Sequence, residues 1–522
     1  MTSTSSSPTL TGAQVLVQQF AARGVRRIFG VPGGDCSLDI IEAASAAGID
    51  FVLARNENAA AMMASVTAEL SGGLGVLLTT RGPGLANGAN GVACASLDRS
   101  ALLVISDGYE NEQAFVSHQR FDQRALLAPV TKGALRVDAP AALASVGALL
   151  DLALQDPPGP VYLELTGKGI RCNVPAASVA VQVQDVAPAA LAEASLAAAQ
   201  ALMQAARRPV AGLQAADAQA SAALRELVAR WGCPVFATYK GKGAVSDRDD
   251  HAMGHFMAGG AEDETMHAAD LIVTFGADPI EFLPKPWAYK APVVQLSTHA
   301  FARDYGVPAA AVVGDIAQAA RRLTPGLQAS GWQPAELAAL KAHMRQRARV
   351  PDNGTAITPN RLVDVVCAAL PDNARIAVDA GAHMLPVMAA FEARRPRDVL
   401  ISRGLATMAY ALPAAIGAAL EQPDRPVVAF TGDGGLMMCA SELATAVQAG
   451  CKITVFVFND SSIALIGVKQ QQRKLRREGM DYTATDFAQV ARGFGCEGIR
   501  VNHPDDLQDA VARDLGEVGG GV

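Results

Sequence analysis

Two aspartates in the carboxyl-terminal third of the chain, Asp433 and Asp460, have the chemistry and the setting of metal ligands. A hard cation such as Mg²⁺ prefers carboxylate, amide and carbonyl oxygens, and it usually shares its shell with phosphate oxygens. Asp433 lies among glycines, which leave bare backbone for phosphate oxygens to approach. These glycines are Gly432, Gly434 and Gly435. The residue types therefore predict a socket for a metal-bound diphosphate.

The segments around the two aspartates predict how such a socket is built. Residues 427–430 and 453–458 are short apolar runs typical of buried strands, and residues 436–450 have a helical pattern that ends at a glycine. Two parallel strands joined by one crossover helix end at the same sheet edge, where open α/β sheets bind ligands. A Gly-Asp-Gly turn alone is compatible with an ordinary strand-to-helix connection, but the second aspartate favours the functional interpretation.

With these motifs, the sequence resembles the thiamine diphosphate-dependent enzymes from about residue 11 to about residue 500. The resemblance implies that Asp433, Asp460 and the backbone carbonyl of Ser462 bind Mg²⁺, which holds the thiamine diphosphate. Most members of the family have Asn where this chain has Asp460. Because aspartate is an equally hard oxygen donor, we expect metal binding to persist with one more negative charge.

A glutamate in the amino-terminal third, Glu57, is a candidate catalytic residue. It stands between a predicted strand, residues 51–54, and a predicted helix of small residues, 59–70. A glutamate at a helix start commonly serves only to interact favourably with the helix dipole. The resemblance instead implies that Glu57 hydrogen-bonds the pyrimidine ring of the cofactor, where a carboxylate relays the proton whose loss activates the cofactor.

Two further loops of the amino-terminal third match the family. The turn at Gly34 resembles the glycine turn that faces the reaction centre, and the loop with Gly82, Pro83 and Asn87 resembles the one beside the pyrimidine. The second loop also approaches a dinucleotide-binding fingerprint, but Asn87 occupies the position of its last glycine. We therefore expect Gly34 to line the reaction centre and the other three residues to bind the cofactor.

Gln119 and His118 are candidates for contact with the substrate. Gln119 corresponds to a substrate-facing glutamine of acetohydroxyacid synthases and of benzaldehyde lyase. A lone histidine such as His118 is more often a surface or core residue, so that alternative stays open. The paired-histidine motif of pyruvate decarboxylases is missing from the sequence, and the resemblance therefore favours acetohydroxyacid synthases and related carboligases.

The segment 404–420 carries no charged side chain. A membrane span needs about 20 apolar residues, and Pro413 and Gly417 would interrupt it, so we expect a buried helix. The resemblance implies that Met408 forms a wedge that bends the cofactor, although core packing would also explain a methionine. It also implies that the backbone carbonyl of Ala406 binds the pyrimidine amino group. The remaining cofactor-binding candidates, on a loop expected to grip the diphosphate, are Gly381, Ala382 and His383.

Amino-acid composition and missing motifs argue against several other classes of protein. The chain has 522 residues, half of them apolar, and a net charge of −7, with no basic tract long enough for nucleic acid binding. Its eight cysteines form no C-x-x-C pair and no zinc-like spacing, so we expect reduced thiols in a cytoplasmic protein. The H-E-x-x-H and G-x-S-x-G motifs are absent, which argues against zinc and serine hydrolases.

The order of predicted elements indicates an α/β protein with three doubly wound, Rossmann-like parallel-sheet domains. After a disordered tail, residues 1–10, we expect a pyrimidine-binding domain at 11–175, a central domain at 190–325 and a diphosphate-binding domain at 355–522. Relatives hold FAD, ADP or nothing in the central domain, and FAD stays an open alternative without support in the sequence. Relatives also continue beyond the last helical stretch, so we expect an edge strand to be missing.

The resemblance implies a decarboxylating carboligase, a transferase or lyase of the acetolactate synthase type. A 2-oxo acid such as pyruvate would lose carbon dioxide, and the resulting enamine would add to an aldehyde or ketone. The active sites would lie between subunits of a homodimer or homotetramer, without nucleic acid or membrane partners. Two alternatives stay open, namely an FAD-containing enzyme like pyruvate oxidase and a non-catalytic paralogous subunit.

Overall fold

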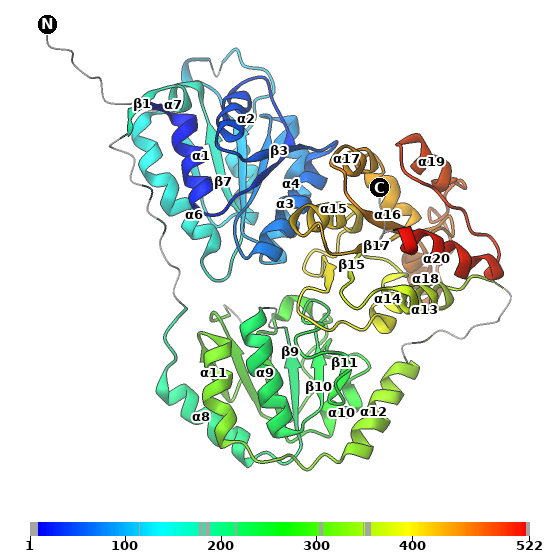
Figure 1. Ribbon diagram of the computed structural model, residues 1–522. Helices are drawn as coiled ribbons and strands as arrows, with labels where there is room; N and C mark the ends of the chain where they lie inside the picture. Colours follow the sequence, from blue (N-terminus) through cyan, green and yellow to red (C-terminus); the bar gives the residue numbers. More distant parts are fainter. Residues whose placement is uncertain are drawn as a thin grey trace, which may run out of the picture.

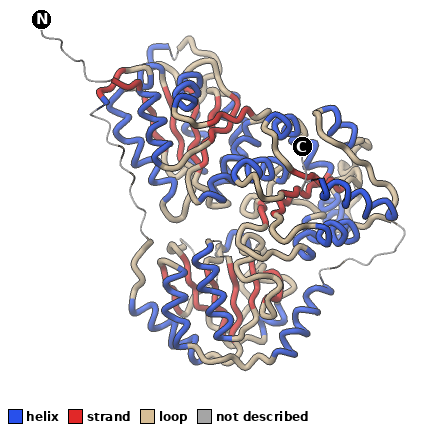
Figure 2. The backbone as a smooth tube through the Cα atoms, viewed as in Figure 1, coloured by secondary structure: helices blue, strands red, loops and turns tan. Residues whose placement is uncertain are grey.

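Three parallel β-sheets flanked by helices make up the computed structural model of this protein (Figure 1). In Figure 2, each sheet is a group of red strands with blue helices around it. The three-domain α/β fold expected from the sequence is confirmed. The structure describes residues 9–113, 115–176, 181, 183, 188–214, 217–301, 306–347, 349 and 356–517.

The amino-terminal sheet has parallel neighbours throughout. Its strands are β2 (Arg27–Val31), β3 (Asp50–Leu53), β4 (Gly75–Thr79), β5 (Leu102–Asp107), β6 (Ala134–Val137) and β7 (Val161–Leu165). Their order is β3-β2-β4-β5-β7-β6. Strands β4 and β5 are buried along their whole length, since helices cover both faces, and apolar residues therefore follow one another without alternation. The helices are α1 (Gly12–Ala22), α2 (Cys36–Ala46), α3 (Glu57–Ser71), α4 (Pro83–Leu97), α5 (Gln123–Leu127), α6 (Val146–Leu154) and α7 (Gly167–Ile170).

The predicted tail differs from the structure at its end. Residues 1–8 lie outside the described part of the chain. Thr9 and Leu10, however, belong to strand β1 (Thr9–Thr11), which pairs antiparallel with β8 (Asn173–Pro175). These backbone hydrogen bonds hold the start of the domain against its last strand, so the amino-terminal domain includes two residues that we expected to be disordered.

The central sheet is also parallel. Its strands are β9 (Pro209–Leu213), β10 (Val235–Ala237), β11 (Ala252–His255), β12 (Leu271–Phe275), β13 (Val293–Ser297) and β14 (Ala310–Val313), in the order β11-β10-β9-β12-β13-β14. The inner strands β9 and β12 are continuous buried runs of mainly apolar residues. The edge strands β11 and β14 are only partly buried. The helices are α8 (Glu193–Ala205), α9 (Ala218–Trp231), α10 (Asp263–His267), α11 (Ile316–Leu323) and α12 (Pro334–Arg347).

The carboxyl-terminal sheet has the order β16-β15-β17-β18. Its strands are β15 (Arg375–Val378), β16 (Val399–Ile401), β17 (Val427–Gly432) and β18 (Ile453–Phe458). Strands β17 and β18 run parallel and pair Gly432 with Phe458, so the residues that follow both strands lie at one edge of the sheet. The helices are α13 (Pro359–Ala369), α14 (Met384–Ala390), α15 (Ala411–Glu421), α16 (Asp433–Cys439), α17 (Glu442–Gln448), α18 (Ala464–Gln472), α19 (Phe487–Gly493) and α20 (Leu507–Glu517).

The single helix expected over residues 436–450 is instead two helices, α16 and α17. The first begins at Asp433 itself, and the second begins at Glu442, whose side chain is fully buried. The Glu442 carboxylate accepts a hydrogen bond of 3.1 Å from the backbone N–H of Arg55 in the amino-terminal domain. The break between the helices therefore coincides with a contact between domains, which a local sequence pattern does not reveal.

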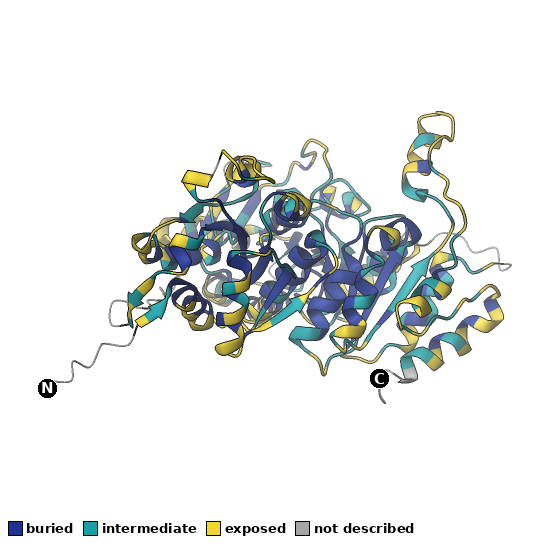
Figure 3. Cartoon of the chain, turned by 90° about the horizontal axis from the view of Figure 1, so that it is seen from above, coloured by how far each residue is buried: buried dark blue, intermediate teal, exposed yellow. Residues whose placement is uncertain are grey.

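Helices α3 and α15 join the amino-terminal and carboxyl-terminal domains. Both are rich in alanine, and their backbones approach closely, since a Cβ atom on Gly417 would lie 2.7 Å from the carbonyl oxygen of Met63. The buried helix expected within residues 404–420 is confirmed as α15. In Figure 3, buried segments fill the interior and exposed residues lie on the outer helices and loops. No helix in the described part of the chain has both the length and the apolar character that a membrane crossing requires.

Replacing Gly417 by alanine should lower the stability of the protein. The new methyl group would meet the backbone of Met63, so we expect a loss of about 1–3 kcal/mol from overpacking. This loss outweighs the gain in helix propensity, which is roughly 1 kcal/mol at most. The midpoint of thermal unfolding measures the effect. Gly493→Ala at the end of α19 is the matched control, because nothing lies within 4 Å of its Cβ position. A midpoint for Gly417→Ala at or above that of the wild type would contradict the close contact.

Candidate active site

The two aspartates predicted to bind metal lie next to each other at the edge of the carboxyl-terminal sheet. Asp433 follows β17 as the first residue of α16, and Asp460 follows β18. Both carboxylates accept a hydrogen bond from the backbone N–H of Ser462, at 3.2 Å for Asp433 and 3.1 Å for Asp460. The Ser462 hydroxyl also donates to Asp460 at 3.1 Å. The register of the two parallel strands thus brings the three metal-site candidates together.

The electrostatics of this pair favour a cation. Burial and the charge of Asp460 raise the pKa of Asp433, while the backbone N–H of Gly434 at 2.7 Å lowers that pKa. A divalent ion between two neighbouring carboxylates would remove their repulsion. Within the described residues, no group of three or more His, Cys, Asp or Glu side chains forms a metal cluster. An all-oxygen shell that backbone, water or phosphate oxygens complete would fit Mg²⁺.

Gly434 and Gly435 make room for side chains of other segments. A Cβ atom on Gly434 would lie 2.9 Å from the hydroxyl of Tyr482 and 3.1 Å from the terminal methyl group of Met408. A Cβ atom on Gly435 would lie 2.2 Å from a carboxylate oxygen of Asp379. Met408 therefore lies against the turn that carries Asp433, where a wedge beside the diphosphate socket would have to be.

Asp379 holds the loop that carries Met408. Its side chain is fully buried, and one carboxylate oxygen accepts the backbone N–H groups of Tyr410 at 2.6 Å and Ala411 at 2.7 Å. The other oxygen accepts the hydroxyl of Thr431 on β17. Burial raises the pKa of Asp379, and these donors oppose the rise. Sequence reasoning identified Asp379 only as the first residue of the loop expected to grip the diphosphate, because its contacts with Thr431 and the start of α15 join distant segments.

The loop before α15 is strained at two alanines. Ala406 has a φ of 51° and Ala409 a φ of 64°, in the left-handed region that glycine adopts most readily. Glycine would adopt this conformation at position 406 without strain. The Ala406 side chain is exposed, so its methyl group is accommodated without displacing the loop.

His383 is a buried, neutral side chain beside the turn at Gly432. Burial lowers its pKa to about 4, and its ring stacks on Phe458 at a centroid distance of 5.3 Å. Cβ atoms on Gly381 and Gly432 would lie 2.6 Å and 3.3 Å from the imidazole. Nε2 is buried, and no described residue hydrogen-bonds it. The two glycines face the ring edge that carries Cε1 and Nδ1, and the half-buried Ala382 lies in the same turn as Gly381.

Glu57 is the first residue of α3 and is 8% exposed. Its carboxylate accepts a hydrogen bond of 2.6 Å from the side-chain amide of Asn87 on α4. A Cβ atom on Gly84 would lie 3.0 Å from the same carboxylate, so the glycine lets α4 start directly beneath it. The side chain of Asn56 makes the capping bond of α3, to the N–H of Asn58 at 2.9 Å. Asn56, and not Glu57, therefore supplies the side-chain hydrogen bond that caps α3.

The loop at Gly82 packs against the segment with Gln119. Gly82 has a φ of 66°, and a Cβ atom on it would lie 2.4 Å from the Gln119 carbonyl oxygen. Pro83 follows as the first residue of α4, where its missing N–H costs no hydrogen bond. The side chains of Gln119 and His118 are exposed. Gly34 is exposed as well, with open space beyond its Cβ position.

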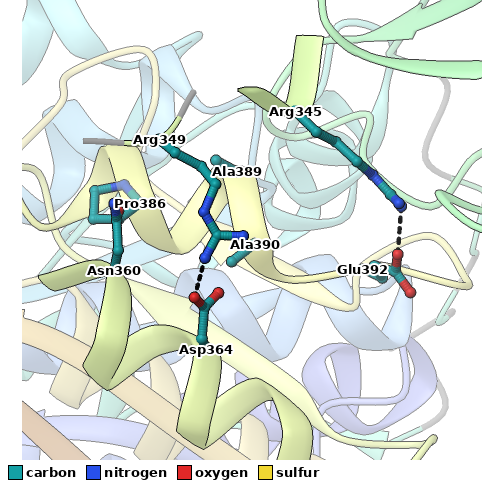
Figure 4. Close-up of a pocket in the computed structure, with 8 residues that line it drawn as sticks. All are labelled: Arg345, Arg349, Asn360, Asp364, Pro386, Ala389, Ala390 and Glu392. Carbon is teal, nitrogen blue, oxygen red and sulfur yellow. Dashed lines mark hydrogen bonds and ion pairs between the residues drawn. The ribbon is translucent and has the colours of Figure 1, made fainter. Parts of the chain in front are cut away.

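The candidates form two groups in this chain, one around Glu57 and one around Asp433. Within the described residues, no hydrogen bond or ion pair connects the two groups. A cavity of about 220 Å³ lies elsewhere, beside α12, α13 and α14, where Arg345 pairs with Glu392 and Arg349 with Asp364 (Figure 4). No predicted site residue lines it.

Sequence reasoning missed two other residues near these groups. Tyr482 reaches Gly434 from a segment that folds back on the turn with Asp433, and its N–H donates to the Ser461 carbonyl at 2.7 Å. Gln123 is buried beside Gly82 and accepts its N–H at 2.7 Å. Neither residue carries a local signal, because each contact depends on how distant segments fold together.

Comparison with known proteins identifies the domains. Three models of thiamine pyrophosphate enzymes match, namely the N-terminal binding domain at residues 10–126, the central domain at 196–323 and the C-terminal binding domain at 379–521. Acetolactate synthase of Bacillus subtilis is 29% identical, covering 97% of this chain and 91% of the relative. Probable 2-ketoarginine decarboxylase of Pseudomonas aeruginosa is 31% identical over the same shares of the two chains. Acetolactate synthase isozyme 1 large subunit of Escherichia coli is 29% identical, covering 99% and 94%.

Both groups of site residues lie within the matched terminal domains, Glu57 in the amino-terminal one and Asp433 in the carboxyl-terminal one. The matched models follow one another in the order of the three sheets, and the relatives align over nearly the whole chain. The resemblance read from the motifs is confirmed, and this chain belongs to the thiamine pyrophosphate enzyme family.

Proposed function

We propose that this protein is a thiamine diphosphate- and Mg²⁺-dependent enzyme that decarboxylates a 2-oxo acid and joins the remaining fragment to an aldehyde or ketone, as acetolactate synthase-like carboligases do. The observation that carries the proposal is the buried Glu57 carboxylate, which Asn87 orients and which is not needed as a helix cap. Relatives named acetolactate synthase and 2-ketoarginine decarboxylase support this choice of reaction class.

The carboxyl-terminal group would hold the cofactor. Asp433, Asp460 and the carbonyl of Ser462 would bind Mg²⁺, and Nε2 of His383 would donate to a phosphate oxygen. Met408 would support the bent cofactor at its middle. When bound, thiamine diphosphate supplies a carbon nucleophile and an electron sink for decarboxylation. The protein's part is to orient this group and exclude competing water.

The amino-terminal group of residues would transfer a proton to and from the cofactor and would contact the substrate. Glu57 would exchange a proton with the pyrimidine ring, which a buried carboxylate near the start of a helix can do without bulk water. Gln119, with His118 beside it, would contact the 2-oxo acid, and the Gly34 turn would leave space for it. Exposure of Gln119 and His118 in the single chain is consistent with a surface that another element covers.

A homodimer or homotetramer would complete the site. Large apolar side chains are exposed beside both groups, and Phe115 close to Gln119 is 96% exposed. The others include Leu38, Val116, Leu385, Met437 and Met438. Such residues close to polar site groups are typical of a surface that a partner covers. A second copy would place its Glu57 group over the Asp433 group of the first. Eight unbridged cysteines support the accompanying proposal of a cytoplasmic location.

Changing Glu57 to Gln should abolish most turnover while leaving cofactor binding intact. Removing a proton-transfer group lowers the rate by about 10²- to 10⁴-fold, whereas the metal and diphosphate contacts lie in the other domain. Titration calorimetry with thiamine diphosphate and Mg²⁺ measures binding, and carbon dioxide release from a panel of 2-oxo acids measures turnover. Glu42→Gln on the exposed face of α2 is the control. Wild-type turnover in the Glu57 variant would refute the proton role, and a flavin spectrum with peroxide formation would favour the oxidase alternative.

Changing Asp433 to Ala should weaken Mg²⁺-dependent cofactor binding by at least about 100-fold, since loss of a mere outer-shell partner already costs 10–100-fold. Asp460→Asn is the informative comparison, because it keeps an oxygen donor and removes the like charge beside Asp433. We expect that variant to bind nearly as well as the wild type. Calorimetric titration with thiamine diphosphate in excess Mg²⁺ measures the affinity of each variant. Undiminished binding by Asp433→Ala would rule out the metal site.

A further inference from the structure

Gln123, the first residue of α5, is 2% exposed and makes hydrogen bonds to three different segments. Its side-chain carbonyl accepts the N–H of Gly82 at 2.7 Å. Its side-chain NH₂ group donates to the backbone carbonyl of Asp107 at 3.2 Å and lies 3.3 Å from the hydroxyl of Tyr162. The same amide thus satisfies a buried donor with one end and a buried acceptor with the other.

The bond to Gly82 reaches the candidate catalytic residues. Gly82 is the N-cap of α4, and this helix carries Asn87, which holds the Glu57 carboxylate. Gly82 also presses on the backbone of Gln119, whose own φ is 61° and whose carbonyl accepts the hydroxyl of Tyr109. A shift of Gly82 would therefore displace the supports of Glu57 and Gln119 together.

The surroundings of the Gln123 amide require a neutral group. Tyr162 and Glu164 face it from β7, Asp107 from β5, and Arg136 of β6 is paired with Glu164. Burial and the charge of Glu164 raise the pKa of Tyr162, so its hydroxyl stays protonated and bonds Ser106 at 2.8 Å. A carboxylate in place of the amide would still accept the N–H of Gly82, but it would face the carbonyl of Asp107 and the charge of Glu164. The hydroxyls of Ser106 and Tyr162, which already bond each other, are its remaining nearby donors.

We propose that Gln123 is a positioning residue for the reaction, which fixes the Gly82 loop and through it sets Glu57 and Gln119. This inference rests on the proposed function of the site. It predicts that the amide's hydrogen-bonding pattern, rather than the volume of the side chain, determines cofactor affinity and turnover.

Two variants of the full chain separate these possibilities. Gln123→Leu leaves the Gly82 N–H buried without an acceptor, and we expect kcat to fall and the Kd for thiamine diphosphate to rise, each about 10- to 100-fold. The KM for the 2-oxo acid should change far less. Gln123→Glu retains the acceptor, and its carboxyl group can replace the lost donor only while protonated.

The Gln123→Glu variant therefore has its own pH signature. Burial together with Asp107 and Glu164 raises the pKa of the introduced carboxyl group, with Arg136 opposing. Below that pKa, the neutral group donates to the Asp107 carbonyl and activity approaches the wild type. Above it, activity is lost. The wild type and Gln123→Leu lack this additional transition, so recovery at low pH in Gln123→Glu alone would support positioning by hydrogen bonds.

Asp122→Ala is the matched structural control. It removes the side-chain cap of α5, a bond of 2.9 Å to the N–H of Ala125, but leaves the bonds of Gln123 in place. It should lower the midpoint of thermal unfolding without the pH transition. If folded Gln123→Leu has wild-type Kd and kcat, or if Gln123→Glu shows no recovery at low pH, the inference is overturned while the proposed function stands. If the wild type itself binds no thiamine diphosphate with Mg²⁺, the proposed function is overturned first.

Discussion

The close approach of α3 and α15 is the contact on which both halves of the site depend. Small residues along these helices, with Gly417 against the backbone of Met63, let the amino-terminal and carboxyl-terminal domains pack without intervening side chains. Helix α3 begins with Glu57, and α15 begins directly after the loop that carries Met408. One helix pair therefore fixes the positions of two groups that are far apart in the sequence.

Each terminal domain uses a buried aspartate to tie a glycine turn to its neighbours. Asp379 receives the start of α15 and lies against Gly435. Asp107 occupies the corresponding position at the end of β5. Its carboxylate accepts hydrogen bonds from the N–H and the hydroxyl of Ser37, at 2.8 Å and 2.9 Å, and lies against Gly33. In both places the glycine is required because a side chain would collide with the carboxylate. Both domains thus fix a turn at the end of a strand with a buried aspartate that lies against a glycine.

The sequence predicts those parts that depend on local patterns. Short apolar runs located β3, β17 and β18, and the parallel register of the last two then placed Asp433 beside Asp460. The helix break at Glu442 and the roles of Gln123 and Tyr482 were not predictable, because each depends on a partner from a distant segment. Side-chain orientation at loops such as that of Gln119 is equally non-local, so the motif identifies the residue and the fold determines what it touches.

The bond between Glu442 and the Arg55 amide has a consequence for modular engineering. The acceptor lies in one domain, and the donor stands two residues before Glu57 in another, so the two domains do not make independent building blocks. A chimera with a carboxyl-terminal domain from another protein would need an acidic side chain at the position of Glu442 to accept the Arg55 N–H. Without one, the turn entering α3 would lose its anchor, even though every residue of the recipient's own domain had been preserved.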